Sequence, residues 1–488
     1  MRVALFVFVL ASLASAAGAA APSPVAEYAV EAGDGARELR VEATFTEGPS
    51  GADLVFDEGM GRYVRDAQVA GGKAWAAAAV EDDTLRTTAC RTGCRVRYVF
   101  LLEEAARGAR NRNSAFAQGA ALVAAPSVWL VRPAARGPGQ YRLRVTTPGG
   151  FSFATGLFPA GAGAYEAKLS DLPEAPYSAF GPFETARIQV TGGVVEVAVL
   201  PGETALDRTA LLAWVERAAG DVAAYYGRFP LPRTLVILIP GGRRAVGFGT
   251  TMGNGGGSIM IWVGATASEI DLRRDWVLTH EMVHLGLPNL PSAQHWMEEG
   301  LATYVEPIAR ARHGHLSVEE VWTDLVRRTP QGLPGSGGLD ANRGFGAIYW
   351  GGALFWLLAD VEIRERTDNR KTLEDALRGI RDAGGSIAVT WPVDRTLEVA
   401  DRAVGVPVLG PLFARMAQSG ERVDLPALWA RLGLEDAGGI RFRDDAPPAP
   451  SKLFSRARSF GPGFSVCEVR SVARPSHESL VQRTIASR

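Results

Sequence analysis

Residues 276–287 read "WVLTHEMVHLGL", which places His280 and His284 four positions apart, with Glu281 directly after the first histidine. Residues four apart on an α-helix lie on nearly the same face, one turn apart. A helix here would direct both imidazoles at one point, and Glu281, about 100° further round, could reach a water molecule there without being a ligand itself. The spacing therefore predicts a metal site on a helix.

A second stretch contains a candidate for the third ligand. "HWMEEGLATYVEP", residues 295–307, follows a linker whose Pro288 and Pro291 suit a sharp break between two helices. A zinc ion that keeps one coordination position for water needs three protein ligands. Glu299 lies fifteen residues after His284, which is far enough for the chain to turn and bring this carboxylate beside the imidazoles.

Several neighbouring residues leave alternatives open. His295, in the linker, is the competing third ligand, and helix rotation decides whether Glu298 or Glu299 faces inward. Glu306 is expected to be a surface group or a partner of the ligands. Each zinc-bound imidazole also needs an acceptor for its other N–H group. The candidates for this role are Thr303 and Asp275.

The alternative to a metal site is an ordinary buried helix. Five-residue patterns such as HExxH recur by chance, and a histidine on an apolar helix is more often a core residue than a ligand. Here, however, the chain has only six histidines, and three of them lie within residues 280–295, just ahead of a Glu-Gly pair. We therefore favour the metal site.

The two stretches together resemble the gluzincin metallopeptidases, which are thermolysin-like enzymes of the MA-type clan with a second motif W-x-x-E-G-x-A-x-Y. The matching positions are Trp296, Glu299, Gly300, Ala302 and Tyr304. Since the motif glutamate precedes the glycine, the resemblance selects Glu299 over Glu298.

The resemblance implies an enzyme with one Zn²⁺ bound by His280, His284 and Glu299. Glu281 would act as the general base that activates a metal-bound water for peptide-bond hydrolysis. Two other functions stay open, because a fold does not decide a substrate. One is a catalytically inactive, peptidase-like binding protein, and the other is a zinc hydrolase of a non-peptide substrate.

Further along, "IYWGGALFWLL", residues 348–358, looks like the Y-x-K-G segment of the same enzymes. Tyr349 and Gly352 match it, while Gly351 replaces the lysine. The resemblance implies that the Tyr349 hydroxyl stabilises the tetrahedral intermediate. The alternative is an aromatic core residue in a helix rich in Trp and Phe.

The expected substrate contacts lie upstream of the histidines. Aminopeptidases of this type carry G-x-M-E-N, whose glutamate binds the free amino group of the substrate, whereas this chain has "GTTMGN" at 249–254. Aminopeptidase and endopeptidase activity therefore both stay open. The strand "SIMIWVG", residues 258–264, looks like the edge strand that pairs with the substrate backbone. The expected substrate-binding residues are Met252, Gly253, Asn254 and Ser258.

The fold can also be read from the pattern. Residues 25 to about 185 are predicted to be β-rich, because short runs of β-branched residues lie between Gly and Pro turns. Beyond them, 209–229 has helical spacing and ends near Gly227, and "TLVILIP", 234–240, is typical of a buried strand. Further helices are expected at 273–287, 296–312, 317–328, 346–366, 371–383 and 407–433.

Segments 225–240 and 411–434 look like parts of the glycyl aminopeptidase branch, although its C-terminal PDZ domain has no room here. The expected fold class is multidomain α+β. The expected parts are a signal peptide (1–21), an N-terminal β-sandwich-like domain (22–185), a thermolysin-like zinc peptidase domain (186–315), a C-terminal α-helical domain (316–440) and a loosely ordered tail (441–488).

Bulk composition limits the partners. The formal net charge is −1, and no basic stripe is interleaved with aromatics, so a peptide or protein substrate is expected and nucleic acid is not. Arg2, an apolar run and small residues are typical of a signal peptide, which predicts export to the periplasm or medium with no membrane span in the mature chain. Cys90 and Cys94 could form a small disulfide loop there, leaving Cys467.

Overall fold

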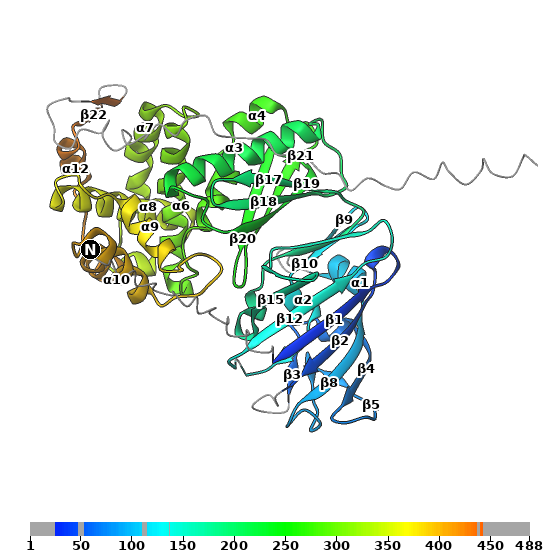
Figure 1. Cartoon of the computed structure of the whole chain (residues 1–488). Coiled ribbons are helices and arrows are strands. Elements are labelled where there is room, and N and C mark those ends of the chain that lie inside the picture. The colour runs from blue at the N-terminus through cyan, green and yellow to red at the C-terminus, as the bar shows by residue number, and fades with distance from the viewer. Residues whose placement is uncertain (1–24, 47–52, 110–114, 136, 437–439, 443–488) are drawn as a thin grey trace, which may run out of the picture.

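The computed structural model describes residues 25–46, 53–109, 115–135, 137–436 and 440–442. The expected signal peptide, nearly all of the expected tail, and Cys467 lie outside these ranges. Figure 1 shows the β-sheets of the N-terminal region (blue to cyan) at the lower right, a mixed sheet with helices (green) above them, and a helical region (yellow to orange) at the left. The predicted multidomain α+β fold class is confirmed.

The N-terminal region is built from sheets. In sheet order, the eight-stranded sheet consists of β14 (Pro159–Gly161), β15 (Ala164–Lys168), β12 (Gln140–Thr146), β1 (Ala26–Ala32), β2 (Leu39–Phe45), β8 (Cys94–Phe100), β4 (Val64–Ala70) and β5 (Ala76–Ala77). One four-stranded sheet consists of β13 (Ser152–Thr155), β16 (Ser178–Gly181), β10 (Ala121–Ala124) and β9 (Ala115–Gln118). The other consists of β11 (Arg132–Pro133), β3 (Leu54–Val55), β7 (Thr84–Leu85) and β6 (Val80–Glu81). The short helices α1 (Leu102–Gly108) and α2 (Pro126–Trp129) lie among them.

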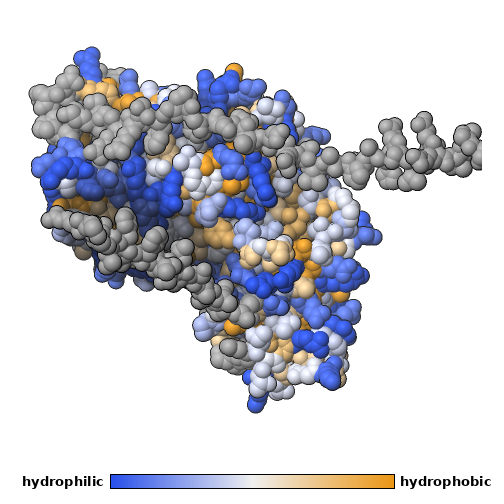
Figure 2. Space-filling model, in the orientation of Figure 1, coloured by the Kyte–Doolittle hydropathy of each residue, from blue (hydrophilic) through white to orange (hydrophobic). Residues whose placement is uncertain are grey.

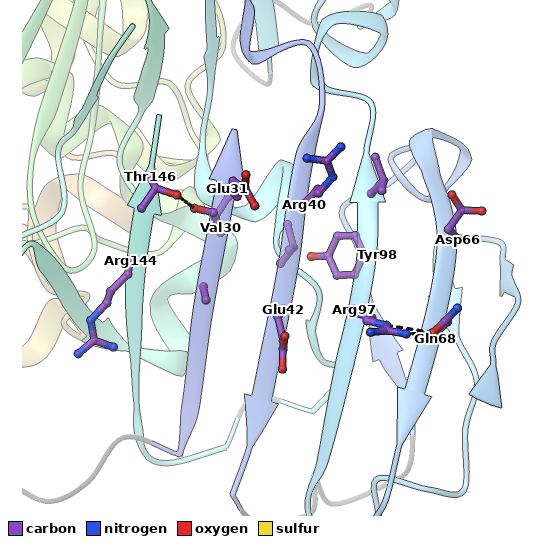
Figure 3. Close-up of a pocket in the computed structure, with 13 residues that line it drawn as sticks. Val30, Glu31, Arg40, Glu42, Asp66, Gln68, Arg97, Tyr98, Arg144 and Thr146 are labelled. Carbon is purple, nitrogen blue, oxygen red and sulfur yellow. Dashed lines mark hydrogen bonds between the residues drawn. The ribbon is translucent and has the colours of Figure 1, made fainter. Parts of the chain in front are cut away.

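Strict alternation explains the two faces of the large sheet. In β2, Leu39, Val41, Ala43 and Phe45 are buried, while the residues between them are exposed or half-buried. The outward residues line an open hollow of about 630 Å³, across which Arg97 donates to Gln68 (Figure 3). Apart from the parallel pair β1–β12 this sheet is antiparallel, and polar side chains of this kind are typical of the solvated face of an antiparallel sheet. Neither of the two stretches that carry the candidate metal ligands, residues 276–287 and 295–307, lies in the large sheet.

Next to this sheet, Cys90 and Cys94 form a disulfide just ahead of and at the start of β8. Both residues are buried. The bridge closes the small loop whose formation the sequence left open.

A five-stranded mixed sheet follows. Its strands, in sheet order, are β17 (Thr185–Val190), β18 (Gly193–Val199), β19 (Arg233–Gly242), β21 (Ser258–Gly264) and β20 (Val246–Met252). The three inner strands are parallel, and each outer strand is antiparallel to its neighbour. In β19, Val236 and Leu238 face the helices, whereas Leu235, Ile237 and Ile239 pack on the N-terminal sheets. Both faces are therefore covered, which is why "TLVILIP" is continuously apolar.

Helix α3 (Arg208–Tyr226) packs on the helical face of this sheet. The Asp207 side chain accepts a hydrogen bond from the Ala210 N–H and caps the first turn. Gly227 ends the helix with φ of 79°, a conformation that glycine adopts without strain. The predicted helix and its glycine stop are thus confirmed.

Helices fill the rest of the described chain. They are α4 (Glu269–Arg274), α5 (Val277–His284), α6 (His295–Arg312), α7 (Val318–Arg328), α8 (Phe345–Arg366), α9 (Leu373–Asp382), α10 (Val393–Val404), α11 (Leu409–Phe413) and α12 (Leu425–Arg431), followed by the hairpin β22 (Leu434–Asp436) and β23 (Ile440–Phe442). Short 3₁₀ turns lie at Asp34–Ala36, Gly61–Tyr63, Leu169–Glu174, Ser292–Gln294, Thr329–Gly332 and Leu339–Ala341, and a π-helical turn at Ala414–Gln418. Two predicted helices, 273–287 and 407–433, are each broken, and α10 was not predicted.

No helix of the described ranges has the length and apolar character that crossing a bilayer requires. Figure 2 shows a face on which hydrophilic residues are mixed with smaller groups of hydrophobic ones.

Helices α6 and α8 approach each other closely at a pair of glycines. A Cβ atom added to Gly300 would lie 2.2 Å from backbone atoms of Gly352, and one added to Gly352 would lie 2.0 Å from the backbone oxygen of Trp296. Helix α6 carries Glu299 and α8 carries Tyr349, so this contact sets the spacing between these two residues.

We expect Gly352→Ala to lower the free energy of unfolding by about 1–3 kcal/mol, because the new methyl group meets backbone that cannot swing aside. Urea denaturation measures this change. The matched control is Gly346→Ala on the same helix, where the nearest atom, 3.0 Å away, is the end of the Gln331 side chain. Equal stability of the two variants would contradict the role of the glycine pair.

Candidate metal centre

The first motif folds into α5, a short helix that begins at Val277 and ends at His284. Asp275 starts it, because its carboxylate accepts hydrogen bonds from the backbone N–H groups of Val277 and Leu278. The four-residue spacing then brings the rings of His280 and His284 to 4.9 Å between centroids. Asp275 therefore caps the helix and accepts a hydrogen bond from the Trp214 indole, and within the described ranges it makes no hydrogen bond to an imidazole.

Helix α6 brings the second motif to the same place. The linker turns at Pro291, and Glu299 Oε2 lies 3.2 Å from His280 Nε2 and 3.7 Å from His284 Nε2. These three side chains are at most 13% exposed, and their ligand atoms lie within 4.8 Å of one another. Two imidazole nitrogens and a carboxylate oxygen are a donor set that suits zinc.

The competing residues face elsewhere or reach only the rim. Glu298 accepts a hydrogen bond from the Leu290 N–H, 2.9 Å away, and contacts His295 Nδ1, so its carboxylate holds the linker. The His295 side chain is 54% exposed, and its Nε2 lies 3.4 Å from the outer oxygen of Glu299. Rotation of α6 thus points Glu299, and not Glu298, at both imidazoles.

The charge state of the triad suits metal binding. Burial raises the pKa of Glu299, but the neighbouring His284 and His280 outweigh it and hold that pKa at about 2. Burial lowers the pKa of His284 to about 4. Burial lowers the pKa of His280 in the metal-free chain, but the hydrogen bond to Glu299 and the negative charges of nearby glutamates together outweigh burial and raise it. Glu299 is therefore an ionised carboxylate at neutral pH, which is the form that binds a metal.

Glu281 is held on the pocket side of α5. Its carboxylate accepts a hydrogen bond of 2.6 Å from the Thr251 hydroxyl, whose oxygen also lies 3.0 Å from the Glu281 backbone oxygen. Burial raises its pKa to about 7 in the metal-free chain, against the opposing effects of His280 and Thr251. Gly249 passes so close that an added Cβ would lie 2.2 Å from Glu281 Cγ. A proton acceptor near neutrality thus lies beside the triad.

Tyr349 completes the site from α8. Its ring is stacked with His280 at 5.8 Å and with Phe345 at 4.0 Å. Its hydroxyl is hydrogen-bonded to Glu299, and burial, together with that carboxylate, raises its pKa well above the usual value. The hydroxyl therefore stays protonated and available as a donor at the triad.

These groups surround a pocket of about 280 Å³. Its lining residues are Gly249, Thr250, Thr251, Glu281, His284, Leu287, Asn289, His295, Glu298, Glu299, Tyr349 and Ile387. The sequence interpretation did not single out Thr250 or Thr251, although they stand within the quoted "GTTMGN".

The four expected substrate-binding residues do not line this pocket. Ser258 is fully buried in β21, where its hydroxyl accepts a hydrogen bond of 2.8 Å from the Tyr177 N–H. Met252 is the last residue of β20 and packs against the core beneath the sheet. These two side chains therefore make their contacts within the protein and do not face the pocket.

Gly253 and Asn254 form the turn between β20 and β21. A Cβ on Gly253 would lie 1.9 Å from the Ile387 backbone oxygen, so the chain passes too closely there for any side chain. Asn254 is buried and donates to Glu174 at 2.8 Å, while its own amide oxygen accepts from Asn289 and Thr390. The turn residues therefore brace this corner of the fold.

The prediction that residues 258–264 form the edge strand of the sheet is wrong. β21 lies between β19 and β20, and the strand at the edge of the sheet is β20, which carries Gly249 and Thr251 into the pocket. The nearly continuous burial of "SIMIWVG" is that of an inner strand with both neighbours present.

Two further expectations concern the surroundings of the ligands. The Thr303 hydroxyl donates to the Glu299 backbone oxygen at 2.8 Å within its own helix, and it is not hydrogen-bonded to any imidazole of the part of the chain that the structure describes. Glu306 is buried and pairs with Arg310 at 2.8 Å, and its charge acts on His280. Glu306 is thus not a surface group.

Neither a family model nor a curated protein matches this sequence. Solved structures do resemble the fold. An aminopeptidase N family protein from Idiomarina loihiensis superimposes with a TM-score of 0.62 at 13% identity, covering 84% of this chain and 78% of that one. An M1 zinc metallopeptidase from Deinococcus radiodurans gives a TM-score of 0.50 at 16% identity, covering 82% of this chain and 94% of that one.

A third similar structure, a mutant two-domain M1 zinc metallopeptidase bound to L-arginine, gives a TM-score of 0.52 at 16% identity and covers 82% of this chain and 94% of that one. At such identities the likeness establishes the fold. The chain therefore resembles M1 zinc metallopeptidases in fold, and its His280, His284 and Glu299 resemble an HExxH…E zinc site.

Proposed function

We propose that this protein is a zinc-dependent metallopeptidase that hydrolyses peptide bonds. The single observation that carries the proposal is the meeting of His280, His284 and Glu299 around one point, with Glu281 beside them in the same pocket. The similarity in fold to M1 zinc metallopeptidases supports it.

The residues of the site have separable tasks. A zinc ion held by the triad would polarise a carbonyl and lower the pKa of bound water towards neutrality. Glu281, with its pKa of about 7 in the metal-free chain, accepts the proton of the attacking water and delivers it to the leaving amine. Thr251 orients the Glu281 carboxylate through the 2.6 Å hydrogen bond.

Substrate binding is proposed along β20. Its free edge offers backbone N–H and C=O groups to an extended peptide, and it runs directly past Glu281. A carboxylate that could bind the free amino group of a substrate is missing at Gly253. The carboxylate of Glu298 is already hydrogen-bonded to the linker, so the preference for free or blocked N-termini stays to be tested. Peptide libraries with free and blocked N-termini, assayed with and without a chelator, test both the activity and its exo- or endo- character. No chelator-sensitive cleavage of either library would refute the peptidase proposal.

We also propose that the protein is exported, on the basis of its N-terminal sequence pattern and the Cys90–Cys94 disulfide. The segments at 225–240 and 411–434 support a position near the glycyl aminopeptidase branch. Cell fractionation of the source organism, with a cytoplasmic marker as control, tests the export.

Tyr349→Phe is expected to lower kcat by about 10–10³-fold with little change in KM, because the hydroxyl acts on charge that develops in the transition state. The ring itself, which packs between His280 and Phe345, is kept in this variant. Steady-state kinetics on a single peptide measures the split between kcat and KM. An unchanged kcat would make Tyr349 a packing residue only.

A further inference from the structure

A second group of metal-binding side chains lies at the other end of α6. Asp221, on α3, has its Oδ1 2.5 Å from His313 Nδ1, and His315 Nδ1 lies 3.1 Å from both oxygens of the same carboxylate. The three ligand atoms lie within 4.8 Å of one another. Together with the triad, this is one of two such groups in the described part of the chain.

A tight backbone turn after α6 brings these side chains close together. Helix α6 ends at Arg312, and the N–H groups of His313 and His315 both return to the Arg310 backbone oxygen, at 3.2 and 3.0 Å. Gly314 stands between the histidines with φ of 73°, a left-handed conformation that reverses the chain. This turn directs both imidazoles towards Asp221.

Burial differs sharply within the group. The Asp221 side chain is 2% exposed, whereas those of His313 and His315 are 34% and 32% exposed. A buried carboxylate requires polar partners, and these two imidazoles supply them. Arg217, one turn earlier on α3, acts electrostatically on Asp221, but its guanidinium donates to the Leu272 backbone oxygen. The carboxylate thus forms the floor of a group whose imidazole side is open to solvent.

We propose that Asp221, His313 and His315 form a second site for a borderline divalent transition metal such as Zn²⁺, which ties α3 to the end of α6. Two imidazole nitrogens with one carboxylate oxygen favour zinc, nickel or copper over magnesium or calcium. The open side leaves a position for water. The site is separate from the peptidase proposal, because it lies at the opposite end of α6 from Glu299.

The distances are compatible with an inserted ion. In a tetrahedral zinc site, neighbouring ligand atoms lie about 3.3 Å apart. The 3.1 Å contacts of His315 already match, and His313 Nδ1 would have to withdraw by less than an ångström from its present 2.5 Å. A side chain that is one-third exposed can make this movement by a small rotation.

The test is zinc stoichiometry in the full chain, prepared without a histidine tag and stripped with a chelator. Equilibrium dialysis at micromolar free Zn²⁺, followed by elemental analysis, should give about two ions in the wild type, about one in His315→Asn, about one in Glu299→Gln, and none in the double variant. Asparagine can still donate a hydrogen bond to Asp221 but is a poor zinc ligand. Equal zinc content in the wild type and His315→Asn would overturn the proposal.

A second measurement keeps the test independent of catalysis and of folding defects. Glu299→Gln loses the triad, so zinc added to it should raise Tm through the second site alone. The same addition should leave the Tm of the Glu299→Gln/His315→Asn double variant unchanged. Absence of a zinc-dependent Tm shift in Glu299→Gln would also overturn the site. Neither of these two Tm results depends on whether the triad supports peptide hydrolysis, so they stand even if the peptidase proposal fails.

Discussion

Replacing Glu281 with glutamine is expected to lower kcat for peptide hydrolysis by about 10³-fold or more while zinc content stays that of the wild type. Glutamine has the same shape and can still accept a hydrogen bond from the Thr251 hydroxyl, but it cannot take up a proton. The carboxylate is not a ligand, since the convergent atoms belong to His280, His284 and Glu299. The variant therefore separates proton transfer from metal binding.

The measurement pairs kcat on one peptide with elemental analysis of the same preparation. Retained zinc with lost turnover is the expected combination. Wild-type turnover would show that another group takes the proton, and lost zinc would place Glu281 among the ligands.

The second large effect is expected for Glu299→Gln, which should lower zinc affinity at the triad by more than about 100-fold, since even residues that only support ligands cost 10–100-fold. An amide is a weak zinc donor and removes the charge that faces His280 and His284 at 3.2 and 3.7 Å. Activity at limiting zinc should fall in parallel. Competition with a chromogenic chelator measures the affinity.

Glu298→Gln is the matched control, because it changes the adjacent residue of the same helix from acid to amide. Glu298 holds the Leu290 N–H and contacts His295, and neither bond involves the triad. We expect zinc affinity close to that of the wild type. If Glu298→Gln lost zinc and Glu299→Gln kept it, the assignment made from the rotation of α6 would be wrong.

The broken helices show what a periodic pattern misses. Residues 273–287 have helical spacing throughout, yet α4 ends at Arg274 and α5 begins at Val277, because Asp275 accepts the first N–H groups of α5. The spacing of apolar residues is insensitive to such a cap. By contrast, α10 was missed although Leu397, Ala400 and Val404 provide a helical apolar face.

The substrate side shows a different limit. "SIMIWVG" and "VGFGTTM" are both strand-like, and only the order of the sheet shows that the second one is the edge. Likewise Asn254 and Ser258 stand in a polar, glycine-rich stretch, but contacts with Glu174 and Tyr177, distant in the chain, keep them inside the fold. Partners that lie far away in sequence leave no local pattern.

By itself the sequence determined the α+β class and the local chemistry, because side-chain spacing within one helix follows from the 3.6-residue turn alone. The pairing of His280 with His284 is of this kind. Only the tertiary structure decided that Glu299 meets them, that Tyr349 arrives from α8 across the Gly300–Gly352 contact, and that Asp221 lies under His313 and His315. These meetings depend on how whole helices pack, which the complete set of long-range contacts determines.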